Sequence, residues 1–149
     1  MEFQTLLESR RSVRSYDASK TVTREQIKEI VEAGILAPSW KNSQTARYYC
    51  VIDEAAKEKF AKECLPEFNI NSSKGAGAYV ITTFVANRSG FDREGNPDKE
   101  CGNGWGYYDL GLHNENVILK AKELGLDTLV MGIRDGEKIR EMLDIPETE

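Results

Sequence analysis

The sequence AYVITTFVA, residues 78–86, is the strongest strand pattern in this chain of 149 residues. Only two threonines interrupt its apolar run, and threonine is itself favoured in strands because it is β-branched. A near-continuous apolar run of this length is typical of a strand that is buried on both faces. We therefore predict that this segment is the central strand of a sheet. As a helix it would be too short to cross a membrane.

A long helix is predicted downstream of this strand, after a polar connection over residues 87–104 that exceeds the usual loop length. The helix covers residues 105–124, and Gly125 suits the position just beyond its end. Its apolar residues occupy more than one side. A helix of this kind is buried within a domain or at a subunit interface.

The remaining elements predict an α+β domain with helices around a small sheet. A capping-box pattern at Thr23 begins a helix that ends before Pro38, and strand-forming residues follow at 48–52. Residues 69–77 are rich in Asn, Ser and Gly and are expected to form a loop. Further segments are predicted as helices at 3–7, 54–65 and 135–143, the last capped by Asp135, and as a strand at 127–133. Three strands make a small sheet, so more strands are expected from unrecognised segments or from a partner.

Composition restricts the class of protein. The chain has 20 Lys and Arg against 25 Asp and Glu, a net charge of -5, which argues against bulk nucleic-acid binding. The length suits a single domain over residues 1–149. Three scattered cysteines and one histidine predict neither a disulfide framework nor a metal site. The scattered cysteines indicate a reducing compartment, so we expect a cytoplasmic protein. No apolar run approaches membrane-spanning length, so no membrane segment is expected.

A cluster of arginines near the N-terminus could bind an anion. Arg10, Arg11 and Arg14 lie within five residues, with Ser12 between them. Guanidinium groups bind phosphate bidentately, and a serine hydroxyl adds a further donor. Taken alone, the segment also fits an exposed basic turn, which is the commoner situation for arginines.

Two polar loops offer groups that could recognise a heterocycle. The segment from Ser39 to Gln44 carries hydroxyl, amide and indole groups, and Trp40 could stack on a flat ring. Asn71 and Lys74 precede the main strand, where a lysine could stabilise charge on a ring carbonyl. Each loop also fits an ordinary turn with solvent-exposed side chains.

Several other patterns carry less weight. The glycines at 102, 104 and 106 lack the GxGxxG spacing and the strand–helix context of a dinucleotide site. His113 lies within the long helix and is expected to be a core or interface histidine. No serine-protease, zincin or P-loop motif is present, so hydrolytic and nucleotide-hydrolysing functions have little support.

Three segments together resemble the nitroreductase family of FMN-dependent oxidoreductases. They are RRSVRSY at residues 10–16, APSWKNSQ at 37–44, and the helix from 109 to 125 followed by DTLVMGI at 127–133. Their order and spacing match from residue 2 to about 146. The joint occurrence of the two N-terminal motifs, about 25 residues apart, is the strongest part of the match.

The resemblance implies a homodimeric α+β enzyme with a mixed or antiparallel sheet and two FMN sites at the subunit interface. Arg10, Ser12 and Arg14, assisted by Arg11, match positions that hold the flavin phosphate and ring. The resemblance implies further cofactor contacts from Pro38, Ser39, Trp40, Asn42 and Gln44 of the other subunit, from Asn71 and Lys74 at the pyrimidine edge, and from Val130, Met131, Gly132 and Ile133 near N5. Gly132 suits that place because it has no side chain to block the ring.

The implied activity is a ping-pong transfer of electrons from NADH or NADPH, through N5 of FMN, to a nitroaromatic, quinone or similar small acceptor. Arg14 and Lys74 would stabilise negative charge on the reduced flavin. Trp40, Phe68 and Tyr107 are expected to form the substrate wall. No metal, nucleic acid or membrane is expected to take part.

The chain departs from the family pattern at its C-terminus. Members usually continue with another strand, a Gly-Tyr-Pro-like turn and a basic tail, whereas this chain ends at Glu149. The chain is then either a naturally short member or a truncated one. In both cases we expect a weaker dimer and an incomplete phosphate site. Two alternatives to a reductase remain open: a flavin-binding module with little turnover, and an anion-binding or protein-interaction domain on the same scaffold.

Overall fold

A computed structural model describes all residues from 1 to 149. Two strands and seven helical segments follow one another along the chain. Their bounds are α1 (Phe3–Ser9), α2 (Arg24–Ile35), the short 3-10 helix η1 (Trp40–Asn42), β1 (Ala46–Val51), α3 (Glu54–Cys64), α4 (Glu67–Ser73), β2 (Tyr79–Phe84), α5 (Gly104–Glu123) and α6 (Gly136–Met142). None of these helices combines the length and apolarity needed to cross a membrane.

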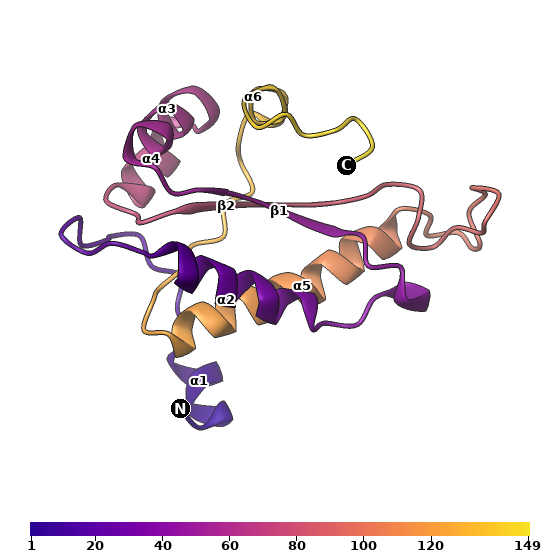
Figure 1. Ribbon diagram of the computed structural model, residues 1–149, viewed down its shortest axis with the longest axis horizontal. Helices are drawn as coiled ribbons and strands as arrows, with labels where there is room; N and C mark the ends of the chain where they lie inside the picture. The colour runs from indigo at the N-terminus through magenta and orange to yellow at the C-terminus, as the bar shows by residue number, and fades with distance from the viewer.

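The elements form three layers, with the sheet in the middle (Figure 1). Strands β1 and β2 pair antiparallel, from Ala46 opposite Phe84 to Val51 opposite Tyr79. Helices α2 and α5 cover one face of this ribbon, and α3, α4 and α6 lie on the other (Figure 1). The predicted α+β class, with helices flanking a small sheet, is confirmed.

Local signals fix the ends of several helices. Thr23 Oγ1 accepts a hydrogen bond of 3.1 Å from Gln26 N, and Gln26 Oε1 accepts one of 2.9 Å from Thr23 N. This is the predicted capping box of α2. Asp135 caps α6 as expected, through Lys138 N at 3.1 Å. Gly125 has a φ of 77°, the left-handed conformation that ends a helix such as α5.

The hydrophobic core is divided by the sheet. The larger cluster packs α3 and α6 against the strands, and the smaller joins α2 to α5 through Ile30, Val117 and Ala121. A Cβ on Gly34 would lie only 2.8 Å from Val117 Cγ2, so the glycine permits the close contact between α2 and α5. On the other side of α5, Tyr107 and Tyr108 remain 71% and 60% exposed. One subunit therefore does not bury all the apolar residues of α5.

Two expectations about the sheet are wrong. Strand β2 pairs only with β1, so it is not central, and most of its residues are half-buried. Residues 127–133 form no strand; they contribute a single parallel bridge between Thr128 and Ser12. Both expectations rested on hydrophobic periodicity, which indicates how buried a segment is. A strand also requires a neighbouring strand in register, and periodicity does not show that neighbour. Of the apolar residues in this segment, Met131 packs against the larger core cluster, whereas Val130 and Ile133 are exposed.

The segment expected to be a loop at 69–77 is partly helical, because α4 occupies Glu67–Ser73. Pro66 precedes the helix, and its carbonyl accepts bonds from Asn69 N and Ile70 N. Ser73 Oγ donates 2.7 Å to Asn69 O and lies 2.8 Å from Tyr79 Oη. Tertiary contacts of these buried polar side chains outweigh the poor helix propensity of Asn and Ser.

Candidate functional site

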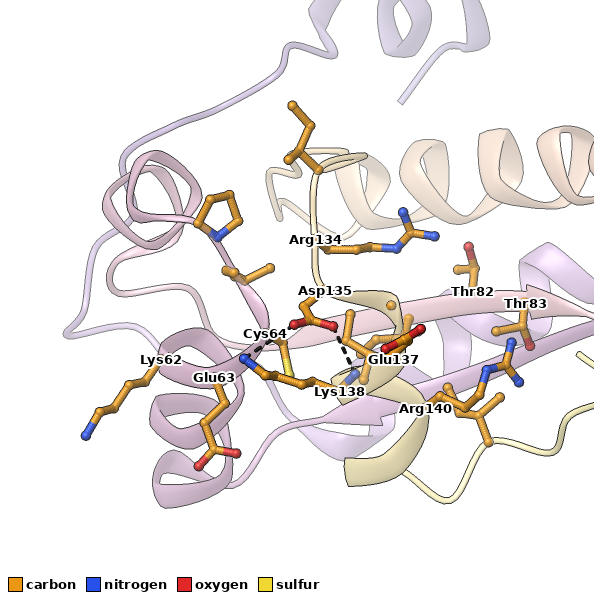
Figure 2. A pocket seen from close by; sticks show the side chains of 17 residues that line it. Lys62, Glu63, Cys64, Thr82, Thr83, Arg134, Asp135, Glu137, Lys138 and Arg140 are labelled. Carbon is orange, nitrogen blue, oxygen red and sulfur yellow. Dashed lines mark hydrogen bonds and ion pairs between the residues drawn. The ribbon is translucent and has the colours of Figure 1, made fainter.

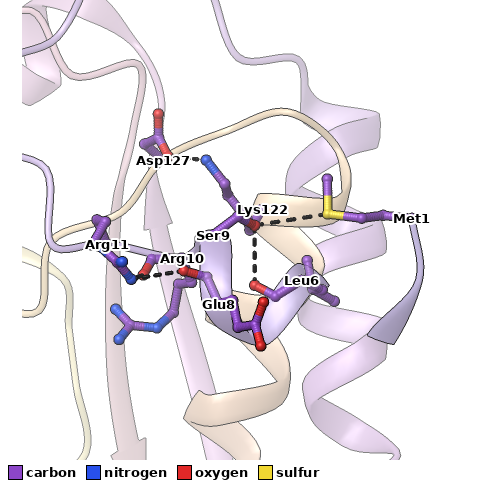
Figure 3. Close-up of polar contacts among 8 residues, drawn as sticks. All are labelled: Met1, Leu6, Glu8, Ser9, Arg10, Arg11, Lys122 and Asp127. Carbon is purple, nitrogen blue, oxygen red and sulfur yellow. Dashed lines mark hydrogen bonds and ion pairs between the residues drawn. The ribbon is translucent and has the colours of Figure 1, made fainter. Parts of the chain in front are cut away.

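The arginine segment is fixed by the chain that follows α5. Val13 N donates a 3.0 Å hydrogen bond to Thr128 O, beside the Ser12–Thr128 bridge. Arg11 Nη1 donates to Glu8 O at 2.8 Å, at the end of α1, whereas the guanidinium of Arg10 has no drawn contact (Figure 3). The segment is therefore held along its backbone, and its arginine side chains contact only backbone carbonyls of residues 8–12.

No carboxylate neutralises these arginines. None of the seven ion pairs in the structure includes Arg10, Arg11 or Arg14. The neighbouring carboxylate of Asp127 is paired with Lys122 at 2.8 Å instead (Figure 3). Three unpaired guanidiniums on one short segment form an arrangement suited to an anionic group.

Three segments that are distant in sequence meet at this end of the sheet. Val13 is bonded to Thr128, and Asn69 Nδ2 donates 2.8 Å to Ile133 O. A Cβ on Gly75 would lie 3.0 Å from Tyr16 O, so the residues after α4 abut the arginine segment. We call this grouping the arginine site: residues 10–14, Asn71 and Lys74, and residues 130–133.

The arginine site also has an apolar side. Val130 is 76% exposed and Ile133 is 65% exposed, although valine and isoleucine are normally among the most buried residues. No atom lies within 4 Å of the position that a Cβ on Gly132 would take. Phe68 projects from α4 and is 54% exposed. An open apolar surface therefore lies in the same grouping as the unpaired guanidiniums.

Tyr16 stabilises the arginine segment from within. Its hydroxyl donates a 2.9 Å hydrogen bond to Val13 O. Burial, and then the nearby carboxylate of Asp127, raise the pKa of Tyr16 above its usual value. The phenol consequently stays protonated and keeps this bond throughout the neutral range.

The second predicted group, residues 38–44, lies at the opposite end of the sheet (Figure 1). Trp40 N donates to the carboxylate of Asp109, near the start of α5. Thr128, in contrast, follows the end of α5. The helix from Asp109 to Leu124 spans about 22 Å at 1.5 Å per residue. One chain therefore does not bring Ser39 and the other residues of this group to the arginine site.

The expected substrate wall is divided in the same way. Phe68 lies on α4, at the arginine site. Trp40 and Tyr107 lie at the other end, where Tyr107 packs edge-on against Phe84 with ring centroids 4.8 Å apart. Within one subunit these three aromatic side chains do not form one wall.

The turn at residues 40–44 has an uncommon backbone. Lys41, Asn42 and Gln44 have φ values of 46°, 55° and 51°, in the left-handed region. For residues other than glycine this conformation costs about 1–2 kcal/mol each. Ser39 Oγ accepts a 2.9 Å bond from Gln44 N, and Lys41 Nζ contacts Asp98 Oδ2 at 2.7 Å. These contacts hold the turn in a defined shape.

Two buried residues that were not predicted as site residues, Asp109 and Ser89, lie behind this turn. Asp109 is 2% exposed and Ser89 is 1% exposed. Ser89 Oγ donates 2.6 Å to Asp109 Oδ2, and the same carboxylate accepts from Trp40 N. The one sequence feature that could have indicated this buried contact is Asp109 itself, a charged residue within an otherwise apolar stretch of α5. His113 is the expected core histidine, 4% exposed, with Nδ1 2.7 Å from Asp109 O.

A cavity of about 930 Å³ lies elsewhere, between the end of α3, α6 and β2 (Figure 2). Cys64, Arg134 and Arg140 line it, together with Thr82 and Thr83 of β2. Of the predicted site residues it includes only Ile133. The cavity therefore does not coincide with the arginine site.

Comparison with known proteins gives consistent matches. The model of the nitroreductase family matches residues 7–149. The Bacillus subtilis protein YdgI, provisionally named an NAD(P)H nitroreductase, is 35% identical over 84 residues. That match covers 56% of this chain but only 39% of YdgI, so the chain spans about two fifths of that relative's length. An Archaeoglobus fulgidus protein, provisionally an NADH dehydrogenase/NAD(P)H nitroreductase, is 26% identical over 95% of this chain and 76% of its own.

A solved structure supports the fold independently. A nitroreductase-like protein from Exiguobacterium sibiricum, crystallised in complex with FMN, has a TM-score of 0.77 and 22% identity. The match covers 99% of this chain and 82% of that one, and at this identity it shows the fold alone. Since the family model aligns with nearly every residue of the sequence, the chain belongs to the nitroreductase family.

Proposed function

We propose that this protein is an FMN-dependent oxidoreductase that takes electrons from NADH or NADPH and passes them to a nitroaromatic, a quinone or a similar small acceptor. The observation that carries the proposal is the arginine site, where unpaired guanidiniums lie in one grouping with an exposed apolar segment. The FMN bound to the Exiguobacterium relative supports the choice of cofactor.

The residues of the arginine site fit the chemistry of FMN. The cofactor has a phosphate at one end and a flat ring system with a polar edge at the other. Arg10, Arg11, Ser12 and Arg14 supply donors for the phosphate and the ring. Asn71 and Lys74 supply donors for the polar edge. At Gly132 the absence of a Cβ leaves open space, as close approach of a ring to the backbone requires.

The chain contributes binding, orientation and electrostatics to the reaction. FMN held at this site would supply the redox chemistry that links the electron donor to the acceptor. Arg14 and Lys74 would place positive charge beside the bound flavin and would stabilise negative charge on it. Val130, Met131 and Ile133 provide an apolar surface that displaces water from the ring.

A second subunit would complete each site. Residues 38–44 contact α5 at Asp109, about 22 Å along the helix from Leu124, and the arginine site of the same chain lies at that far end. In a symmetric dimer, Pro38, Ser39, Trp40, Asn42 and Gln44 would contact the partner's cofactor. Two subunits would likewise bring Trp40 and Tyr107 of one chain toward the partner's Phe68, forming the substrate wall.

Exposed apolar side chains support this assembly. Leu36, just after α2, is 83% exposed, Ile35 is 61% exposed, and Tyr107 and Tyr108 of α5 are also largely exposed. Burying a large apolar side chain contributes about 1.5–3 kcal/mol, so a partner that covered these residues would be bound favourably.

The absorption spectrum of the purified protein tests the proposal. A flavin spectrum is expected, and anaerobic NADH or NADPH should bleach it. Chromatography of the heat-released cofactor should identify FMN. Flavin that is bound but never reduced would favour the binding module over the reductase, and recovery of FAD alone would contradict the assigned cofactor. Failure to bind any flavin would leave only the anion-binding or interaction alternative.

A further inference from the structure

We propose that the buried pair Asp109 and Ser89 is a positioning device that holds the turn at residues 40–44 in the shape required by the partner's cofactor site. This inference rests on the proposed function, because it assigns a purpose to the turn. Neither residue would touch the cofactor. Each would act through the turn, and therefore as a positioning residue.

The partners of Asp109 are unusual for a buried carboxylate. No lysine or arginine pairs with it in the structure. Both oxygens lie within 3.1 Å of Trp40 N, and Oδ2 also accepts the 2.6 Å bond from Ser89 Oγ. A buried carboxylate is costly unless hydrogen bonds compensate for lost water. Here the backbone of the turn and a buried hydroxyl supply that compensation.

Ser89 extends this network to the other end of the turn. Its Oγ lies 2.5 Å from Ser43 Oγ and 3.5 Å from Thr45 Oγ1, which is itself 2% exposed. The Asp109 carboxylate therefore binds the turn directly at Trp40 N and indirectly at Ser43, through the hydroxyl of Ser89. The left-handed residues Lys41 and Asn42 lie between these two points of attachment.

This arrangement explains how a strained turn can persist. Backbone strain survives in proteins where surrounding contacts over-determine the conformation, and such places are common at functional sites. Without the carboxylate, Trp40 N would lose its acceptor and the turn would be free to relax. Ser39 and Asn42 would then no longer be pre-oriented toward a ligand on the partner subunit, and binding would have to order them.

The experiment uses the full chain with Trp105→Phe, so that Trp40 is the single tryptophan and reports on the turn. Asp109→Ala is the test variant and Asp109→Asn the conservative one, because an amide oxygen can still accept from Trp40 N. Val117→Ala, in the same helix but away from the turn, is the stability-matched control. Trp40 emission and acrylamide quenching are measured before FMN is added, and the affinity for FMN is then titrated.

We expect Asp109→Ala to shift Trp40 emission to the red, to increase quenching and to weaken FMN binding by about 10- to 100-fold, the effect of losing hydrogen bonds to a charged group. Asp109→Asn should recover part of both effects. Val117→Ala should lower the melting temperature and should change neither the Trp40 fluorescence nor the affinity for FMN. If Asp109→Ala does not fold, Ser89→Ala, which removes one hydroxyl, should show the same changes on a smaller scale.

The inference is overturned if Asp109→Ala, or Ser89→Ala in its place, behaves like Val117→Ala in both readouts. It is also overturned if Asp109→Asn fails to recover any effect. Failure of the proposed function is a separate result: the parent protein would bind no FMN, whereas Trp40 emission would still report whether the carboxylate holds the turn.

Discussion

Replacing Arg14 with alanine should weaken FMN binding without weakening the fold. The guanidinium of Arg14 makes one long contact, 3.4 Å from Nη1 to Ser12 O, and no ion pair. Its removal should therefore change the free energy of unfolding by no more than about 0.5 kcal/mol. A charge-assisted hydrogen bond to the cofactor contributes about 1.5–3 kcal/mol. The dissociation constant should accordingly rise by about 10- to 150-fold.

The measurement is a titration of the apoprotein with FMN, followed by flavin fluorescence at low and moderate salt. Arg24→Ala is the matched control, because it removes the same charge from an exposed position at the start of α2. Arg10→Ala should resemble Arg14→Ala. Equal affinities in Arg14→Ala, Arg10→Ala and Arg24→Ala would refute the assignment and leave the exposed basic turn as the explanation of the cluster.

Three further outcomes are expected. Gly34→Ala should destabilise the fold by about 1–3 kcal/mol through overpacking, since the new Cβ would lie 2.7 Å from Tyr48 Oη and 2.8 Å from Val117 Cγ2. A denaturant titration measures the loss of stability. An unchanged unfolding midpoint would contradict the tight contact. Burial raises the pKa of Tyr48 to about 12, so its contribution to stability is complete below pH 10 and is lost as the pH rises toward 12. In thermal melts, Tyr48→Phe should lose less stability at alkaline pH than the parent protein, and it should relieve part of the destabilisation by Gly34→Ala. An equal loss of stability at alkaline pH in the parent and in Tyr48→Phe would exclude Tyr48 as its source. Finally, dilution should dissociate the proposed dimer and release its flavin at the same protein concentration. Sedimentation followed at a flavin wavelength can show both events. A monomer that keeps its flavin would contradict a site shared between subunits.

Helices that carry their own end signals were predictable from the sequence. The capping box at Thr23, the cap at Asp135 and the glycine at 125 each act within a few residues, so the local sequence contains the whole signal. The arginine cluster could be recognised for a similar reason, because three basic residues within five positions can be read from the sequence without the fold. Its function was suggested by resemblance rather than by charge alone.

Contacts between distant segments decided the rest. Residues 67–73 became a helix because the buried side chains of Asn69 and Ser73 find hydrogen-bond partners at Ile133 O and Tyr79 Oη. Residues 127–133 lost their predicted strand because they bridge only at Thr128. Whether an apolar segment becomes a strand depends on the neighbour it meets, and its own sequence does not specify that neighbour.

The sequence by itself determined the α+β class, the main helices and the chemistry available for an anion. Only the tertiary structure decided where those groups lie: it gathered the arginines, α4 and residues 130–133 at one end of the sheet. It placed the turn at residues 40–44 at the other end, against the buried Asp109 carboxylate. The physical reason is that periodicity and capping act over a few residues, whereas a site is defined by distances that packing and hydrogen bonding set across the whole chain.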